Sequence, residues 1–537
     1  MAKAPKPVET MSDDCAGGRY AALENDRNVF LQRGRECSLL TVPSILPPAG
    51  FSAASRLPTP YQSLGARGVR TLASKLLLSL FPSNTPFFEY KIDDQTLAKL
   101  GAKRGEFEKA LASRERATCT ELDTSVFRPA AFQALTHLIV TGNAMFYLPK
   151  KQGDRAQMYR IDQYVTRRDP AGNLMEAIIR ERLDVLSLPL DLQARIAATK
   201  EFAGRDKNTY AKTEVDLFTS ITLKSDGKYH VFQEACGVVL PGTEGTYTKE
   251  NMPYFALRFS SQPGEHYGRG YVEEYLGDLD SLEALSEALV EGSAASARIV
   301  FMVNPSGVTS LKVVATAKTG DTVSGNAEDV KVMQVMKGAD LEIAKKQAEE
   351  ISTRLSYAFL LHSAVQRTGD RVTASEIRYM ASELDDGLGG VYTLLAADFQ
   401  SPCVRLFEKR MEARLKVPEL PSDMVHPVLI SGLEAIGRGH DQQNLHMFAQ
   451  DIIQVLTPQI AAQYLNFDEY LKRASAGYGI DPEGLVKSAE EVQAAQQQAQ
   501  QAQMMQTLGP QAIQAAGKMG AQHMSNQAAA SKGPPKQ

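Results

Sequence analysis

The chain has 537 residues, a length that indicates roughly three or four structural units and room for a sizeable core. Its 59 Lys+Arg against 63 Asp+Glu give a formal net charge of −4, which argues against a protein that grips nucleic acid through a broadly basic surface. The five cysteines are odd in number and scattered. Neither a disulfide framework nor a zinc knuckle is therefore indicated, and a reducing compartment is expected.

No catalytic pattern stands out. The two Gly-Lys pairs, Gly227-Lys228 and Gly517-Lys518, are followed by Tyr and Met, so neither completes a phosphate-binding loop. There is no H-E-x-x-H pair and no G-x-S-x-G nucleophile elbow. The longest apolar runs fall far short of the ~20 residues of a bilayer crossing, and no signal peptide is predicted. We expect a soluble protein that is not an enzyme and needs no cofactor or metal, although ligands distant in the chain could still converge on an ion.

The first third of the chain predicts helices. Apolar positions at mixed helical spacing run through residues 16–40, and a clear helical stripe follows over residues 61–81, where Pro82 ends it. A further helix is predicted over residues 128–140. It ends at Gly142, which can adopt the left-handed cap conformation, and a short strand is expected at 144–148.

The middle of the chain predicts antiparallel strands. Residues 158–167 and 174–183 flank a turn-forming segment at 169–173, and residues 215–223 and 229–239 flank Asp226-Gly227. Both pairs are typical of hairpins. The fold class is therefore predicted to be α+β, mainly helical, with a largely antiparallel sheet in this section.

From Tyr271 the pattern becomes helical again and strongly acidic. An apolar stripe runs through residues 271–298, and no basic residue interrupts it before Arg298. A solvated helix face explains such a run without any function. It would nonetheless leave the helix with seven acids that have no partner in reach: Glu273, Glu274, Asp278, Asp280, Glu283, Glu287 and Glu291.

The segments that follow predict a projection and a long helix. Short strands are expected at 299–303, 311–315 and 330–335, then a helix over 339–361, so that two helices enclose a small β insert. The polar segment 362–372 precedes a long helix that starts at Thr373 with Glu376 as its capping partner. Gly387, Gly389, Gly390 and Pro402 should bend this helix. A smaller helical unit is predicted from residue 418 to about 472, followed by a low-complexity tail.

Several strings of residues carry a family likeness. YGRGYVEEYLGDL at 267–279, VNPSG at 303–307, SAVQRTGDRVTASEIRY at 363–379 and SGLEAIGRG at 431–439 resemble the head-to-tail connector, or portal protein, of short-tailed double-stranded DNA bacteriophages. GARG at 65–68 and LASKLL at 72–77 add to the similarity, which covers roughly residues 15–475. Gly270 departs from the serine expected to cap the acidic helix, and the terminal tail matches nothing. Glycine is an acceptable cap, so this departure costs only a few tenths of a kcal/mol.

The resemblance implies a portal architecture for the chain. A ring, usually of twelve subunits, surrounds a channel for genomic DNA. The implied parts are an N-terminal wing (1–270), a first stem helix (271–298), a clip (299–338), a second stem helix (339–361), a tunnel loop (362–372), a long wing helix (373–417), a crown (418–490) and a tail (491–537).

The resemblance also suggests roles for two sets of side chains. Twelve copies of the acidic helix would line the channel with negative charge and keep the duplex centred, provided that face turns toward the lumen rather than toward a neighbouring subunit. Arg367 and Arg371 would face DNA from the tunnel loop and touch phosphates transiently. Alternatively, Arg371 pairs with Glu376 or with a neighbouring subunit.

The implied function is packaging and ejection of double-stranded DNA without sequence specificity, at one capsid vertex of a virion assembled in the host cytoplasm. The implied partners are further copies of the chain, the terminase, major capsid and scaffolding proteins, a tail adaptor and internal core proteins, with no membrane. A tail adaptor or another ring-forming virion protein is the structural alternative. A nuclease is the enzymatic alternative, and divalent-metal-dependent cleavage of DNA would support it.

Overall fold

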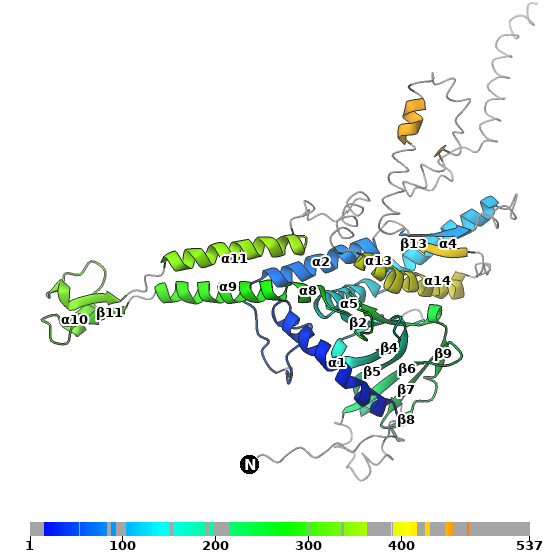
Figure 1. Cartoon of the computed structure of the whole chain (residues 1–537), viewed down its shortest axis with the longest axis horizontal. Helices are drawn as coiled ribbons and strands as arrows, with labels where there is room; N and C mark the ends of the chain where they lie inside the picture. The colour runs from blue at the N-terminus through cyan, green and yellow to red at the C-terminus, as the bar shows by residue number, and fades with distance from the viewer. Residues whose placement is uncertain are drawn as a thin grey trace, which may run out of the picture. The chain divides into compact units, whose positions relative to one another are not determined.

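The structure is a computed structural model. It describes residues 15–52, 54–82, 87–92, 104–150, 154–187, 193–194, 196, 214–297, 300–333, 338–361, 388, 390–415, 425–429, 446–452, 454 and 470–471. The chain forms two compact units, Met1–Ala435 and Ile436–Gln537. The first unit contains every helix and strand discussed below (Figure 1).

More of the described residues lie in helices than in strands, which confirms a mixed α+β fold that is mainly helical. The α-helices are α1 Ala16–Leu39, α2 Leu64–Leu80, α4 Arg104–Thr124, α5 Phe127–Thr141, α8 Tyr271–Glu274, α9 Leu276–Ser296, α10 Leu311–Thr316, α11 Gly338–Ala358, α13 Val391–Leu395 and α14 Ser401–Leu415. The strands are β1 Phe88–Ile92, β2 Asn143–Tyr147, β3 Gln157–Tyr159, β4 Tyr164–Arg168, β5 Leu174–Asp184, β6 Glu214–Leu223, β7 Tyr229–Ala235, β8 Val238–Val239, β9 Gly245–Tyr247, β10 Tyr254–Arg258, β11 Val300–Val303, β12 Val330–Met333 and β13 Val425–Leu429.

Helix α5 forms the centre of the main core. Its apolar residues point in all directions, and Leu135, Leu138 and Ile139 are completely buried because α1, α2 and the strand β2 pack around it. The predicted helix is thus confirmed. The chain then turns at Gly142, whose φ of +75° is the left-handed cap expected from the sequence.

The two predicted hairpins form one antiparallel sheet with strand order β4-β5-β6-β7-β8, and β9 pairs with β7 (Figure 1). The first hairpin starts later than predicted, at Tyr164. Residues 157–159 form a separate strand, β3, which pairs with β2 in a three-stranded sheet that β10 completes. The short helical turn at Ile161–Gln163 redirects the chain between the two sheets. This change of direction cannot be inferred from strand-like periodicity alone.

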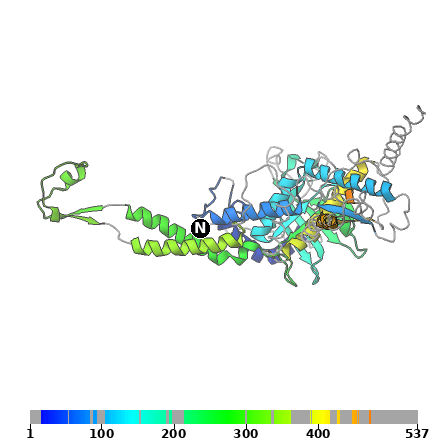
Figure 2. The same ribbon diagram turned by 90° about the horizontal axis from the view of Figure 1, so that it is seen from above.

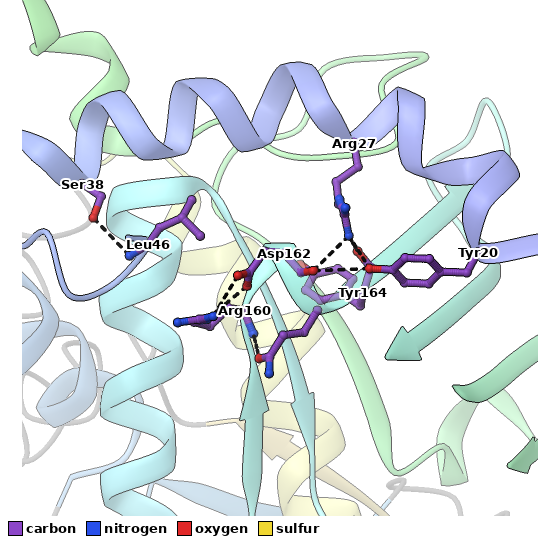
Figure 3. A network of polar contacts seen from close by, with 8 residues as sticks. Tyr20, Arg27, Ser38, Leu46, Arg160, Asp162 and Tyr164 are labelled. Carbon is purple, nitrogen blue, oxygen red and sulfur yellow. Dashed lines mark hydrogen bonds and ion pairs between the residues drawn. The ribbon is translucent and has the colours of Figure 1, made fainter. Parts of the chain in front are cut away.

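Helix α1 is attached to this sheet by a buried arginine (Figure 3). The Arg27 side chain is 2% exposed, and its Nη1 donates to Tyr20 Oη at 2.5 Å and to the carbonyl oxygens of Asp162 at 3.1 Å and Tyr164 at 3.3 Å. Its Nη2 pairs with Glu24 at 2.5 Å. The guanidinium therefore satisfies one carbonyl in the helical turn before β4 and one at the first residue of β4, which stabilises the packing of α1 against the sheet.

Helices α9 and α11 pack side by side and enclose a small insert in the chain (Figures 1 and 2). In the insert, the strands predicted at 299–303 and 330–335 are present as β11 and β12, and they pair antiparallel. The strand predicted at 311–315 is wrong: residues Leu311–Thr316 form the helix α10. Its sequence LKVVAT is rich in residues that favour strands, but local hydrogen bonds beginning at the Ser310 carbonyl favour a helical turn here.

The long helix expected after residue 373 is described only in its second half. There α13, the π-helical turn Ala396–Gln400 and α14 follow one another, so the helix is irregular between Gly390 and Pro402. The bend predicted from its glycines stays a prediction, because Gly387 and Gly389 lie outside the described residues. The start at Thr373 with Glu376 lies outside the described residues. In the segment after residue 418, predicted to be helical, residues 425–429 instead form β13, which pairs with β1 within the first unit.

Candidate functional site

The acidic helix predicted over residues 271–298 is present as α8 and α9, with a break at Tyr275. Tyr271 anchors its start, because its hydroxyl donates to the Ala358 carbonyl near the end of α11 at 2.8 Å. The rings of Tyr271 and Phe359 meet edge to face at 5.8 Å. The Tyr275 ring also contacts Phe359, at 5.9 Å. The start of the first helix and the end of the second are therefore held together by two aromatic contacts and one hydrogen bond.

Three of the seven acids on this helix have partners, which corrects the expectation that none would. Glu273 lies 3.7 Å from Arg33 and 3.5 Å from Arg269. Asp278 pairs with Arg354 of α11 at 2.9 Å. Both carboxylates therefore hold α8 and α9 against neighbouring elements. Arg33 and Arg354 lie more than 200 and more than 70 residues away in the chain, so these two pairings leave no local sequence signal. Arg269, in contrast, lies only four residues before Glu273, so this pairing could have been predicted from the sequence.

Glu283 has a different partner, the chain just before α2. Its two carboxylate oxygens accept hydrogen bonds from the backbone N–H groups of Tyr61 at 2.7 Å and Gln62 at 3.1 Å. Gln62 in turn accepts from Gly65 N at 2.8 Å and donates to the Leu40 carbonyl at 2.6 Å. The carboxylate thus sits at the positive end of α2, where a negative charge is stabilised.

The other four acids are exposed: Glu274, Asp280, Glu287 and Glu291. Among the described residues, no ion pair or hydrogen bond to their carboxylates is found. Asp280, Glu287 and Glu291 are spaced seven and four residues apart, so they share one face of α9. Leu279 and Leu282 are buried on a different face, toward the core that α11 joins. We call Asp280, Glu287 and Glu291 the acidic stripe.

A close backbone crossing leads into this helix. A Cβ placed on Gly268 would lie 2.7 Å from the carbonyl oxygens of Gly142 and Ser260, and one on Gly270 would lie 2.6 Å from the Val140 carbonyl oxygen. Asn143 bridges the crossing, since its side chain bonds both the Gly268 carbonyl and the Gly268 N–H at 2.7 Å. The glycines of the YGRGY string are therefore needed for close approach, and Gly270 begins the helix without a side-chain cap.

Helix α11 ends in a hydrogen-bonded cap at Leu360 and Leu361. Leu361 N bonds the Ser356 carbonyl at 2.8 Å and Leu360 N bonds the Tyr357 carbonyl at 3.0 Å, with Leu360 in the left-handed region at φ +54°. This is the Schellman cap, with leucine where glycine is usual. The buried Lys75 donates to the Leu360 carbonyl at 2.8 Å. Arg367 and Arg371 lie outside the described residues.

The insert between α9 and α11 exposes several large apolar side chains. Four of its large apolar side chains are more than half exposed, and Val308 reaches 86%. They are Phe301, Met302, Val308 and Leu311. Val290 of α9 and Ile343 of α11 are exposed to 56% and 63%. An apolar surface of this kind is typical of an interface with another protein chain.

Within the described ranges, no group of three or more His, Cys, Asp or Glu side chains is arranged to hold a metal ion. Burial raises the pKa of the Cys37 and Cys119 thiols to about 12. It also lowers the pKa of His137 to about 3, so this imidazole is neutral near pH 7. Of the helices that the structure describes, none is both long and apolar enough to cross a membrane.

Comparisons with known proteins identify the class of protein. Residues 14–486 match the family model of the bacteriophage head to tail connecting protein. The chain is 39% identical over 508 residues to the portal protein of Escherichia phage T7, covering 92% of both chains. It is 38% identical over 496 residues to the portal protein of Enterobacteria phage T3, covering 90% of both. It is also similar, at 30% identity over 484 residues, to the portal protein of Enterobacteria phage SP6.

The chain therefore belongs to the bacteriophage head to tail connecting proteins. As a member it is a structural component of the phage particle at the junction of head and tail, and it is not an enzyme. It is a portal subunit that forms an oligomeric ring, through which the genome is packaged and ejected. Among solved structures, the neck of an empty GTA particle matches with a TM-score of 0.34 and 11% identity over 72% of this chain and 86% of that one, a likeness that carries no weight here.

Proposed function

We propose that the helices and strands correspond to the parts of a portal subunit. Helices α8, α9 and α11 form the stem, and residues 299–338 form the clip. The tunnel loop is residues 362–372, and the long wing helix is 373–417. Residues 15–270 contribute the rest of the wing. The crown begins after residue 435 rather than at 418, because β13 pairs with β1 in the first unit.

The ring contains twelve subunits in this proposal, joined head to tail. The exposed apolar side chains of the clip support it, since Phe301, Met302 and Leu311 are each more than half exposed in the single subunit. A heterologous interface closes when each copy covers this surface of the next. Burial should exceed ~2,000 Å² per interface, as in obligate assemblies.

The acidic stripe, together with Glu274, lines the DNA channel in this proposal. The observation that carries it is the shared exposed face of Asp280, Glu287 and Glu291, which have no partner among the described residues. Glu273, Asp278 and Glu283 instead hold the stem in place, so the set of channel-lining acids is smaller than the seven predicted. Repeated around the ring, the stripe repels phosphates on every side, which keeps the duplex centred and free to slide.

The clip is the docking platform for the terminase motor during packaging and for the tail adaptor afterwards. Its exposed apolar residues and its position between the two stem helices in the chain support this role. The wing contacts major capsid and scaffolding proteins, and the crown supports the internal core proteins. DNA is conducted without regard to sequence, because a sliding duplex cannot be read base by base.

Neutralising the acidic stripe should slow DNA translocation. The variant Asp280→Asn/Glu287→Gln/Glu291→Gln removes three negative charges per subunit, so phosphates approach the wall more closely and friction rises. We expect intact rings by electron microscopy and a several-fold lower packaging rate in a terminase-driven assay, with the largest effect at low salt.

The matched control is Asp184→Asn/Glu214→Gln/Glu244→Gln, which removes three exposed acids from the wing sheet region. It should package at the normal rate. Equal rates in the stripe variant and the control would show that the stripe does not face DNA. A protein that stays monomeric at micromolar concentration would contradict the ring itself.

Alanine at both Arg367 and Arg371 should alter DNA retention. In this proposal the tunnel loop touches phosphates transiently, and each exposed contact is worth ~0–1 kcal/mol. Rings should form normally, while filled heads lose DNA more readily. The measurement is the fraction of heads that retain genome after packaging. If rings fail to form, the two arginines hold subunits together instead.

A further inference from the structure

Two lysines from distant parts of the chain lie on neighbouring segments of the wing, since Arg410, next to Lys409, donates to the carbonyl of Pro149, next to Lys150. Lys150 follows β2, and its ammonium lies 4.2 Å from the centre of the Tyr247 ring at the end of β9. Lys409 belongs to α14, and its ammonium donates to the side-chain oxygen of Asn251. Both lysines are exposed. We call Lys150, Lys409, Tyr247 and Asn251 the wing lysine patch.

The positive charge of this patch is not neutralised. Among the described residues, neither lysine forms an ion pair with a carboxylate. The ring of Tyr247 and the amide of Asn251 hold the ammonium groups without cancelling their charge. The two groups also interact with each other: burial, and then the positive charge of Lys409, lower the pKa of Lys150. Bringing two like charges together is unfavourable in the free protein and becomes favourable when an anion binds.

The nearby acids reduce this excess without cancelling it. Glu250 lies 3.7 Å from Arg405, so one acid is matched by one further cation. Glu121 and, more weakly, Asp154 interact electrostatically with Arg410, a second further cation. Counting these five groups with the two lysines, the region carries four positive and three negative charges, a net charge of +1.

The backbone beneath the patch is held by hydrogen bonds and by ring stacking. Arg410 is buried and its Nε donates to the Pro149 carbonyl at 2.8 Å, next to Lys150. Leu148 N bonds the Pro253 carbonyl at 2.8 Å, and the rings of Tyr147 and Tyr254 stack at 4.5 Å. Both lysine side chains therefore extend from a hydrogen-bonded backbone, and an anion that binds here has to order the side chains but not the backbone.

We propose that the wing lysine patch binds phosphate groups of double-stranded DNA, as a contact separate from the channel. Ammonium groups act as point charges toward phosphates and read no sequence, which suits a protein that handles a whole genome. The proposal depends on the family's role as a conduit for DNA, but it does not require that the acidic stripe of α9 faces the channel. Through this patch the ring binds DNA weakly and in a salt-dependent manner at the wing, whereas the acidic wall of the channel repels DNA.

The test compares Lys150→Ala/Lys409→Ala with Lys224→Ala/Lys228→Ala. The second variant removes two positive charges from the turn between β6 and β7 in the same unit. Binding of assembled rings to a ~12-base-pair duplex is followed by fluorescence anisotropy over a range of salt concentrations. We expect the patch variant to bind roughly tenfold more weakly at ~50 mM salt, with a salt dependence of log K shallower by about two. The control should match the wild type.

A second measurement uses the unmodified protein, so it does not depend on a variant folding. Acylation of Lys150 and Lys409 by an amine-reactive reagent should slow when duplex DNA is present, while Lys228 reacts at the same rate. Equal loss of binding in both variants, or no protection of the two lysines, would overturn the proposal. Equal protection by poly-glutamate at the same charge concentration would also overturn it, since the patch would then be a site for an acidic protein.

Discussion

Replacing Gly270 with alanine is expected to destabilise the first unit by about 2–3 kcal/mol and to reduce the yield of rings. The new Cβ would lie 2.6 Å from the Val140 carbonyl oxygen and 3.0 Å from Gly142 N. Both are backbone atoms at the end of the most buried helix, so they cannot move aside. The φ of −81° and ψ of 152° at Gly270 suit alanine, so the penalty comes from the contact and not from the dihedral angles.

The measurement is thermal unfolding of the purified chain, in which this loss should lower the midpoint by about 2–4 °C, because the unfolding entropy of a unit this large is high. Gly277→Ala is the matched control. Gly277 lies on α9 with nothing within 4 Å of the added Cβ, and alanine favours a helix over glycine by about 0.5–1 kcal/mol. The same substitution, seven residues apart, should thus act in opposite directions. A lower midpoint in both variants would show that the crossing is not the cause.

Replacing Glu283 with alanine should release the start of α2 from the stem. Two backbone N–H groups lose a charged acceptor, and a hydrogen bond to a charged group is worth about 1.5–3 kcal/mol. Because Tyr61 is exposed, water compensates in part, and we expect a loss of about 1–3 kcal/mol in the free energy of unfolding. Glu283→Gln should be intermediate, since its amide keeps one acceptor oxygen.

Hydrogen exchange tests this directly. The amides of Tyr61 and Gln62 should lose protection in Glu283→Ala and keep it in Glu287→Ala, which removes an exposed acid four residues further along the same helix. The Glu287 variant should unfold like the wild type. Unchanged protection of both amides in Glu283→Ala would mean that Glu283 does not hold this segment, and Glu283 would return to the set of candidate channel acids.

Much of the fold was predictable because its signals are local. The apolar stripes gave α2, α5, α9 and α11 to within about three residues at most ends, and turn residues gave the β4-β5 and β6-β7 hairpins. Gly142 was predicted as a left-handed cap and has a φ of +75°. The prediction was wrong for α10, because its composition favours a strand whereas its local hydrogen bonds form a helix.

The candidate site was only partly predictable. The sequence identified the acidic helix, but it predicted that none of the seven acids would have a partner. The structure separates them: Glu273, Asp278 and Glu283 have partners, whereas Asp280, Glu287 and Glu291 remain on an exposed face. The wing lysine patch left no signal at all, since its two lysines are 259 positions apart and neither lies in a motif.

By itself, the sequence determined the helical periodicity, the turns, the acidic run and the family, because each depends on residues close together in the chain or on their order. Only the tertiary structure decided which charges are neutralised and which glycines are needed. Ion pairs such as Asp278–Arg354 and close approaches such as Gly270 to Val140 join residues that are distant in the chain. Their energy depends on separations of a few ångströms, which a linear pattern does not contain.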